Sequence, residues 1–530
     1  MIKRRMELSK TVENLIAVFE QDRILSKGES GVSVSRTVSA LATLYEKARN
    51  AVEFRAEHLV RRAAIERILK RRIMLGENAE TIAENLAIEL MWAKYIDSSF
   101  VNEQKSKELT SIIKRYLYIR QHVFGQTGKA DGLSWGTMLG LASSEIDEAI
   151  ISPTKRAALV NFVYQAFRQR IKIPKLDEKQ HDIQTYIAVE RGFAQADNAL
   201  ISYHLLRIMY PAWFLVQDDT IATHVDTFLE QVRYIQDNLF LRVNAPIVRH
   251  LRTQLPPYRL IRDLFLEQKE TELRSIIDDP EKLDAALETL ASKRYHEIGA
   301  KVRRAVVRSI IYIFLTKMIF ALALEAPYDL FVAKRLDYIP LFINLLFPPI
   351  LLYFVAGFIK IPGAENTKLL VAKARGILHY FDDAKVAGGI YTGTIKNNRP
   401  ILSAIFTIFY IAAFAMSFGV IAFTLTKLHF NFVSQVIFVF FVALVSIFAY
   451  RIRQSAKEYE VVEHQGILEP LIDFFFLPIL HAGDMLSKEI AKINFFIFLF
   501  DFVLEAPLKV IFGVVEEWIR FIRMKKEEIL

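Results

Sequence analysis

The 530-residue chain contains no cysteine, which excludes disulfide bonds, thiolate metal sites and a cysteine nucleophile. It also lacks the His-Glu-x-x-His and Gly-x-Ser-x-Gly motifs of zinc peptidases and serine hydrolases. We therefore expect no catalytic residue, no metal site and no cofactor, so that the protein is not an enzyme. A membrane enzyme without a recognisable motif is the minor alternative. The basic N-terminal segment has no signal-peptide core, and we expect no cleaved signal.

The glycine-rich segment 125–132 (GQTGKADG) does not meet the requirements of a phosphate-binding loop. Two residues separate Gly125 from Gly128, whereas a P-loop needs four between its glycines, and Lys129 is followed by alanine instead of a hydroxyl residue. The segment predicts an ordinary loop and marks a further domain boundary near residues 125–132.

Two long uncharged apolar runs follow each other near the C-terminus. Residues 401–426 and 430–450 each reach the roughly 20 residues that cross the hydrocarbon core of a bilayer. Only Lys427, Leu428 and His429 separate them. The two runs predict a transmembrane hairpin, in which helices satisfy the backbone polar groups.

Four further apolar segments flank this hairpin. Segments 309–324 and 338–359 precede it, and both are candidate spans. Segment 467–480 and a last segment that ends before Pro507 are short and contain acidic residues. These two predict either complete spans, which gives six in total, or re-entrant helices, which gives four. The periodicity of residues 508–530 predicts an amphipathic interfacial helix.

Lysine and arginine are distributed unequally between the flanks of these segments. Residues 292–308, 360–400, 451–466 and the C-terminal tail carry 20 of them, whereas the opposite flanks carry 5. Because positively charged flanks stay in the cytoplasm, we predict a multi-pass protein of the plasma (inner) membrane with both termini cytoplasmic. The net charge of +9 then predicts contact with anionic lipid, and no nucleic-acid partner is expected. The amphipathic part of 360–400 is expected to lie on the inner leaflet.

Residues 1–300 are polar and charged, and they show helical periodicity without strand-like alternation. They predict a multi-helix domain that is separate from the membrane domain. The last predicted helix, 280–324, is expected to run into the first span without a break and to couple the two halves. The other predicted helices cover 35–75, 79–97, 102–123, 145–170, 182–210, 219–245 and 256–277.

The helix predicted over 35–75 combines an apolar seam with many arginines on its other faces. Such a helix typically packs one face and exposes the other to solvent. The exposed face is also our candidate surface for a protein partner or for lipid. Its arginines are Arg55, Arg61, Arg62, Arg67, Arg71 and Arg72.

Ionisable residues within the apolar segments are the other candidate site. Charge at bilayer depth is costly and usually faces a bundle interior or a wet cavity. The functional interpretation is a polar path for an ion, a proton or a solute; the alternative is that these groups lie at the interface or cap broken helices. We expect Lys317 to pair with an acid of the last two segments. The residues are Lys317, Glu325, Glu469, Asp473, Asp501 and Glu505.

Together these patterns predict an all-α protein with three parts. A cytoplasmic helical domain covers 1–300, a polytopic membrane domain covers 301–507, and an interfacial helix covers 508–530. We favour a membrane-anchored scaffold or adaptor with a cytoplasmic protein partner. A channel or transporter is the second hypothesis, and homo-oligomerisation is compatible with both.

Overall fold

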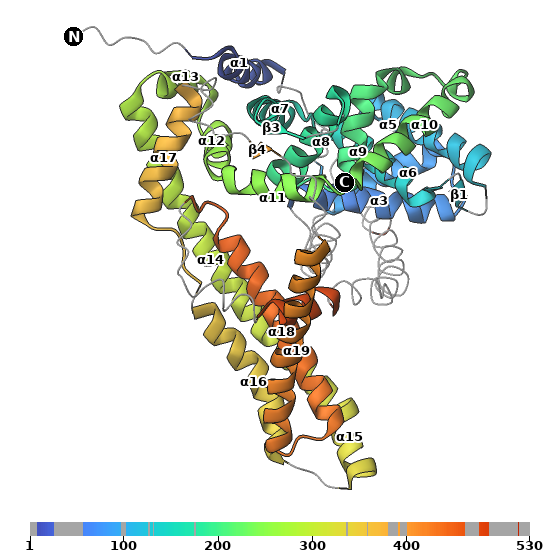
Figure 1. The fold of residues 1–530 in the computed structure, drawn as a ribbon. Coiled ribbons are helices and arrows are strands. Elements are labelled where there is room, and N and C mark those ends of the chain that lie inside the picture. The colour runs from blue at the N-terminus through green and yellow to red at the C-terminus, as the bar shows by residue number, and fades with distance from the viewer. Residues whose placement is uncertain are drawn as a thin grey trace, which may run out of the picture.

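The computed structural model describes most of the chain. It is almost entirely helical, with a head of packed helices above a narrower bundle (Figure 1). We call the helices that form the first two hydrophobic cores the head. The apolar parts of α14 (Pro280–Phe320), α16 (Tyr338–Gly357), α18 (Pro400–Lys427) and α19 (Phe432–Ala456) are called the bundle. The described residues are 8–25, 57–96, 102–125, 128–130, 132–173, 176–334, 338–357, 359–379, 391–392, 400–461, 476–486 and 518.

One core of the head is built mainly by six α-helices, four of which have a side-chain N-cap. Asn78, Asn102 and Ser134 each accept a hydrogen bond from a backbone N–H of the first turn, which satisfies a donor that the helix leaves unpaired. Apolar side chains on the inner faces then meet around the fully buried Trp213. The helices are α3 (Glu57–Met74), α4 (Ala79–Trp92), α5 (Glu103–Ile119), α6 (Trp135–Ile150), α9 (Asn198–Met209) and α10 (Ile221–Leu239).

The second core of the head joins segments that are far apart in the sequence. It includes the first part of the 41-residue helix α14 and also Ile452, Ala456 and Tyr459, which lie at and just beyond the end of α19. Its helices are α1 (Lys10–Leu25), α7 (Thr154–Arg168), α8 (Glu178–Val189), α11 (Asn244–Gln254), α12 (Pro256–Glu267), α13 (Glu270–Ile277), α14 (Pro280–Phe320) and α17 (Ala364–His379).

Several predicted helices of the head are divided in the structure. The helix predicted over 145–170 is broken at Pro153, because proline cannot continue a helix that precedes it. The helix predicted over 182–210 is broken before Asp197, whose side chain caps α9. Residues on both sides of 125–132 belong to the same core, so the predicted boundary there does not separate two cores.

Short elements complete the head. Strand β1 (Lys129–Ala130) pairs antiparallel with β2 (Leu133–Ser134), and β3 (Ile171–Lys172) pairs parallel with β4 (Tyr391–Thr392). The π-helical turns η2 (Arg120–Phe124) and η3 (Glu190–Ala194) end two α-helices, and η4 (Pro211–Leu215) is a 3₁₀-helix.

Among the described residues, four helical segments are long and apolar enough to cross a membrane, which confirms the first four predicted segments as helices. The first runs from Pro280 to Val332 and includes α14, so the predicted continuity between head and bundle is also confirmed. Beyond α14 it contains η5 (Ala321–Glu325), α15 (Ala326–Tyr328) and η6 (Asp329–Ala333). The others are α16 (Tyr338–Gly357), α18 (Pro400–Lys427) and α19 (Phe432–Ala456).

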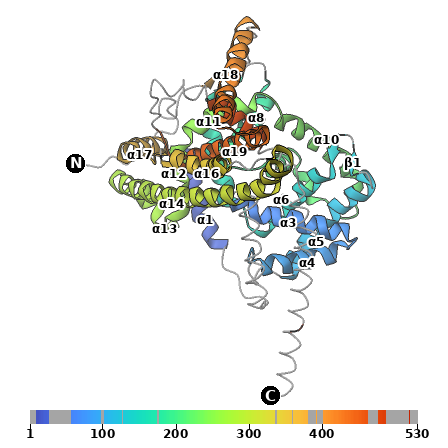
Figure 2. The same cartoon turned by 90° about the horizontal axis from the view of Figure 1, so that it is seen from below.

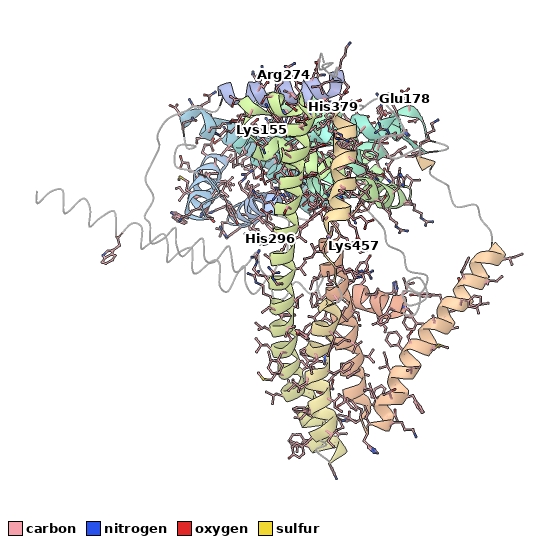
Figure 3. All side chains as sticks on the ribbon, turned by 90° about the vertical axis from the view of Figure 1, so that its left-hand side faces the viewer. Lys155, Glu178, Arg274, His296, His379 and Lys457 are labelled. Atoms are coloured by element: carbon pink, nitrogen blue, oxygen red, sulfur yellow. The ribbon has the colours of Figure 1, made fainter. Side chains whose placement is uncertain are left out.

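The apolar helices are packed to different degrees. Helices α14, α16 and α19 share a core around Phe441, whereas α18 diverges from them and exposes most of its apolar surface (Figures 2 and 3). A further apolar helix, Phe476–Leu486, packs on α19, and a Cβ at Gly483 would overlap the carbonyl of Ala443. Such close packing on small residues is typical of helices in membranes.

Helix α17 corrects one expectation from the sequence. Its apolar side chains, among them Leu370, Ala374 and Leu378, are buried in the second core against α12 and α14. The amphipathic pattern of 360–400 therefore reflects packing within the head, and this apolar face is not free to lie on a leaflet. An amphipathic helix has the same periodicity whether protein or lipid covers it.

Candidate functional site

Two buried charges lie within the bundle. Lys317 of α14 and Glu325 of η5 both have no exposed side-chain surface, and Nζ lies 3.7 Å from Oε2. They are eight residues apart on one helical segment and pair with each other. Pairing of Lys317 with an acid of a later segment stays a prediction, because those acids lie outside the described residues.

Other polar groups complete this site from neighbouring helices. Asn344 of α16 donates Nδ2 to Glu325 and, at 3.3 Å, to the backbone carbonyl of Ser434 on α19. The Lys317 ammonium lies 4.8 Å from the ring centre of Phe441, a cation–π distance. We call Lys317, Glu325 and Asn344 the intramembrane triad, and it connects three of the four long apolar helices.

A second polar contact lies farther along the same helices. Asp329 of η6, which is 5% exposed, accepts a hydrogen bond of 2.5 Å from Asn431 Nδ2. The Asn431 side-chain oxygen caps α19 by accepting from Ser434 N at 2.8 Å. The turn before α19 is therefore tied to the end of the first apolar segment.

The triad is enclosed and its two charges have opposite signs. A buried pair of this kind holds helices in one register, and removal of either charge leaves the other uncompensated. Movement of an ion through it would require the helices to separate. The other residues predicted for a polar path, Glu469, Asp473, Asp501 and Glu505, lie outside the described residues.

The arginines of α3 have partners inside the head, which corrects their interpretation as a free surface. Arg62 is 2% exposed and contacts Ser143, Glu66 and Asp197. Arg61 Nε donates to Asp147 at 2.5 Å. Glu66 belongs to α3 itself, whereas the other partners come from α6 and from the start of α9, so the arginines fasten α3 to the core.

The end of α3 is fastened in the same way. Arg71 and Arg72 both bind the carboxylate of Glu89 on α4, whose side chain is 2% exposed, at distances from 2.6 to 3.2 Å. Arg72 also donates to Glu77 at 2.8 Å. Arg67 is partly buried, and Arg55 lies outside the described residues. The excess of arginine on this helix is therefore largely explained by internal ion pairs.

A cavity of about 720 Å³ opens on the head between α5, α6 and α9. Buried Arg115 pairs with Glu145, and burial raises the pKa of the Glu145 carboxyl although Arg115 acts to lower it. The neighbouring wall carries a second pair, Arg207 and Glu148, at 3.2 Å. Leu215 lines the same cavity and is 82% exposed. The cavity thus offers both signs of charge beside an exposed apolar side chain.

His204 connects this cavity to the interior of the head. Its Nε2 lies 2.6 Å from Glu148 and its Nδ1 lies 2.7 Å from Glu190, so both ring nitrogens face carboxylates. Burial by itself would lower the pKa of His204, but the two glutamates outweigh burial and raise that pKa to about 9. The imidazole is therefore protonated at neutral pH and donates two hydrogen bonds.

Sequence reasoning did not find this group, because His204 lies 14 residues from Glu190 and 56 from Glu148. No local spacing connects three residues on separate helices. Among the described residues, no group of three or more His, Asp or Glu side chains is arranged to hold a metal ion.

The fold defines an all-α protein, and the part of the chain that the structure describes contains four helices that are long and apolar enough to cross a membrane. No protein-family model matches the chain, and no curated protein or solved structure matches it either.

Proposed function

We propose that the protein is a membrane-anchored adaptor that binds a protein partner through its helical head, with the head in the cytoplasm and the bundle in the plasma (inner) membrane. The observation that supports this most directly is the 720 Å³ cavity on the head, with its ion pairs and exposed Leu215. Concave sites with a few convergent polar groups are the usual binding sites of proteins.

The cavity favours a peptide segment over a small apolar molecule. Arg115, Arg207 and Lys105 supply positive charge, and each lies beside a glutamate of the same wall. A polypeptide offers backbone carbonyls, N–H groups and mixed side chains to such a surface. Leu215 and the adjacent Phe214 provide the apolar contact that specific protein interfaces place at their centres.

Site-specific photo-crosslinking tests the proposal. A photoreactive phenylalanine at Leu215 in the full-length protein is expected to give one dominant protein adduct in native membranes. The same group at Phe240, which is 70% exposed at the end of α10, is the matched control. The Arg207→Glu substitution should remove the Leu215 adduct, because it reverses one charge of the cavity wall. Equal adducts from positions 215 and 240, or none from 215, would contradict the adaptor role.

The second candidate function is an ion or solute channel or transporter, favoured by the buried triad. A path through Lys317 and Glu325, continued by Asp473, Asp501 and Glu505, would pass through the bundle interior. The test is ion and proton flux into liposomes that contain purified protein, compared with empty liposomes. Flux that disappears in the double variant Lys317→Leu with Glu325→Leu, in which no buried charge is left without its partner, while the melting temperature is retained, would favour transport over the adaptor role.

A further inference from the structure

A second cavity, of about 640 Å³, lies where the end of α19 meets the head. Its walls come from η3, α11, α12 and the last turns of α19 with the segment that follows. Figure 3 shows the labelled Lys457 at this junction, below the head and above the bundle. We call it the junction cavity; its charged lining residues are Arg191, Arg252, Arg259, Arg451, Lys457 and Glu458.

The walls of the junction cavity are held rigidly together. The Tyr459 hydroxyl donates to Asp263 on α12 at 2.5 Å. Asn366 of α17 donates to the Tyr459 carbonyl at 2.8 Å and accepts from Val461 N at 2.7 Å. The chain that leaves α19 is therefore fixed to the head by side-chain and backbone hydrogen bonds. A ligand in the cavity would meet preformed walls, which lowers the entropy cost of binding.

Positive charge predominates among the described residues that line the junction cavity. Five cationic side chains line it, and Glu458 is the one acid among the described lining residues. Arg191 is bound by neutral groups, namely Asn244, Asn198 and the carbonyl of Leu239, at 2.7 to 2.9 Å. Lys457 has an acidic partner outside the cavity, Glu460, at 3.1 Å.

Arg259 is the buried centre of this group. It is 8% exposed, and its two terminal nitrogens donate to the carbonyls of Glu458 and Gly192. Its Nε has no hydrogen-bond partner among the described residues, and it forms a long ion pair of 3.7 Å with the carboxylate of Glu458. Burial lowers the pKa of Arg259 from its ordinary value. Glu458 and Tyr459 act to raise this pKa, and the neighbouring arginines Arg262 and Arg252 act to lower it further. A bound anion would offset both the burial of the Arg259 charge and its repulsion by neighbouring arginines.

The position of the cavity along α19 indicates where such an anion comes from. The apolar stretch of this helix ends at Tyr450, and the next residue, Arg451, already lines the cavity. If α19 crosses a bilayer, the cavity lies at the level of the lipid headgroups. Arginine clusters bind phosphate oxygens through paired charge-assisted hydrogen bonds.

We propose that the junction cavity binds a phosphate-type anion, supplied either by the headgroup of an anionic lipid or by a soluble phosphate. The site fastens α19 to the head, so that an occupied cavity stabilises their junction. The proposal needs only this cavity and the position of α19, and it is independent of the adaptor role.

The test uses full-length protein in a nonionic detergent without phosphate. Binding is measured by calorimetry with three probes: inorganic phosphate, short-chain phosphatidic acid and short-chain phosphatidylcholine. The cavity variant is Arg252→Ala with Arg451→Ala, since both side chains are exposed and line the cavity. The matched control is Arg249→Ala with Arg453→Ala, which removes the same charge from the same two helices outside the cavity.

Wild-type protein is expected to bind phosphatidic acid, and the cavity variant should raise its Kd about tenfold or more. The control variant should change the Kd less than about twofold. Arg252→Lys with Arg451→Lys should retain part of the affinity, and melting temperatures without ligand establish that all variants fold. If inorganic phosphate binds as well as phosphatidic acid, the anion comes from a soluble phosphate. If phosphatidic acid alone binds, the anion is the headgroup of a lipid. If neither inorganic phosphate nor phosphatidic acid binds, the proposal is wrong. It is also wrong if the cavity and control variants lose the same affinity for phosphatidic acid.

Discussion

At the residue scale, several buried charges of the described residues have a partner of opposite charge. Arg62 and Glu89 are buried and His204 is partly buried, and each lies beside a group of opposite charge. Such pairs cost desolvation when they form, and they cost more when one partner is removed. These ion pairs therefore select one arrangement of helices. Substitution of one residue of a pair tests whether that pair forms in the folded protein.

The first prediction concerns His204 and pH. Because its folded pKa is about 9 and its ordinary value is 6.5, its interactions stabilise the head fully below pH 6.5 and are lost as pH rises through 9. The loss amounts to at most about 3 kcal/mol. The melting temperature of wild-type protein should fall across this range by more than that of His204→Gln.

The exposed histidine His296 on α14 provides the control, since His296→Gln should retain the wild-type pH profile. If the melting temperatures of His204→Gln and of the wild-type protein fall equally between pH 6.5 and 9, His204 is not the titrating group.

The second prediction concerns the intramembrane triad. Lys317→Leu or Glu325→Leu alone leaves one buried charge without its partner, and each should destabilise the protein by about 3–5 kcal/mol. The combined substitution removes both charges and should recover most of this loss. Melting temperatures in detergent measure the effect, with Met318→Leu on the same helix as a control. A double variant that is less stable than either single variant would exclude a compensating pair.

At the element scale, α19 organises the bundle. Its side chains contact α14 and α16 on one side, and α18 and the helix Phe476–Leu486 on another. Hydropathy alone detected both α18 and α19, but it could not tell that α19 is central and α18 peripheral. Both helices are apolar on all faces, so their periodicity carries no information about which face is packed.

The third prediction tests the packing of the short apolar helix on α19. Gly483→Ala introduces a Cβ that overlaps the carbonyl of Ala443, so the helix must move away from α19. We expect a loss of about 1–3 kcal/mol, the usual cost of overpacking. Gly419→Ala on α18 is the control, because a Cβ there meets no atom within 4 Å. Equal melting temperatures for the two variants would show that this contact does not form in the folded protein.

At the scale of the whole molecule, α14 and α19 connect the head to the bundle at two places. Helix α14 contributes Leu283 and Val302 to the head core and Ile313 to the bundle core without interruption. Tyr459, just after α19, is fixed to α12. Two connections restrict both the tilt and the rotation of the bundle relative to the head. A movement of the bundle helices is therefore mechanically linked to the head.

The fourth prediction is the topology, which the absence of cysteine makes simple to test. A cysteine at exposed Lys427, between α18 and α19, should react with a membrane-impermeant maleimide in intact cells. A cysteine at Arg274 of α13, in the head, should react only after permeabilisation. Reaction at both positions in intact cells would refute the spanning arrangement, and the reverse pattern would place the head outside.

The sequence by itself determined the helical class, the four long apolar helices and the continuity of α14 into the bundle. These features follow from local quantities, namely hydropathy summed over about 20 residues and the spacing of apolar side chains along a helix. Only the tertiary structure decided the partners of charged residues: Glu325 for Lys317, Glu89 for Arg71 and Arg72, and two glutamates for His204. It also decided that α17 packs on the head and that cations gather at the end of α19. A charge has no periodicity that identifies its partner, because pairing depends on distances between helices that are remote in sequence.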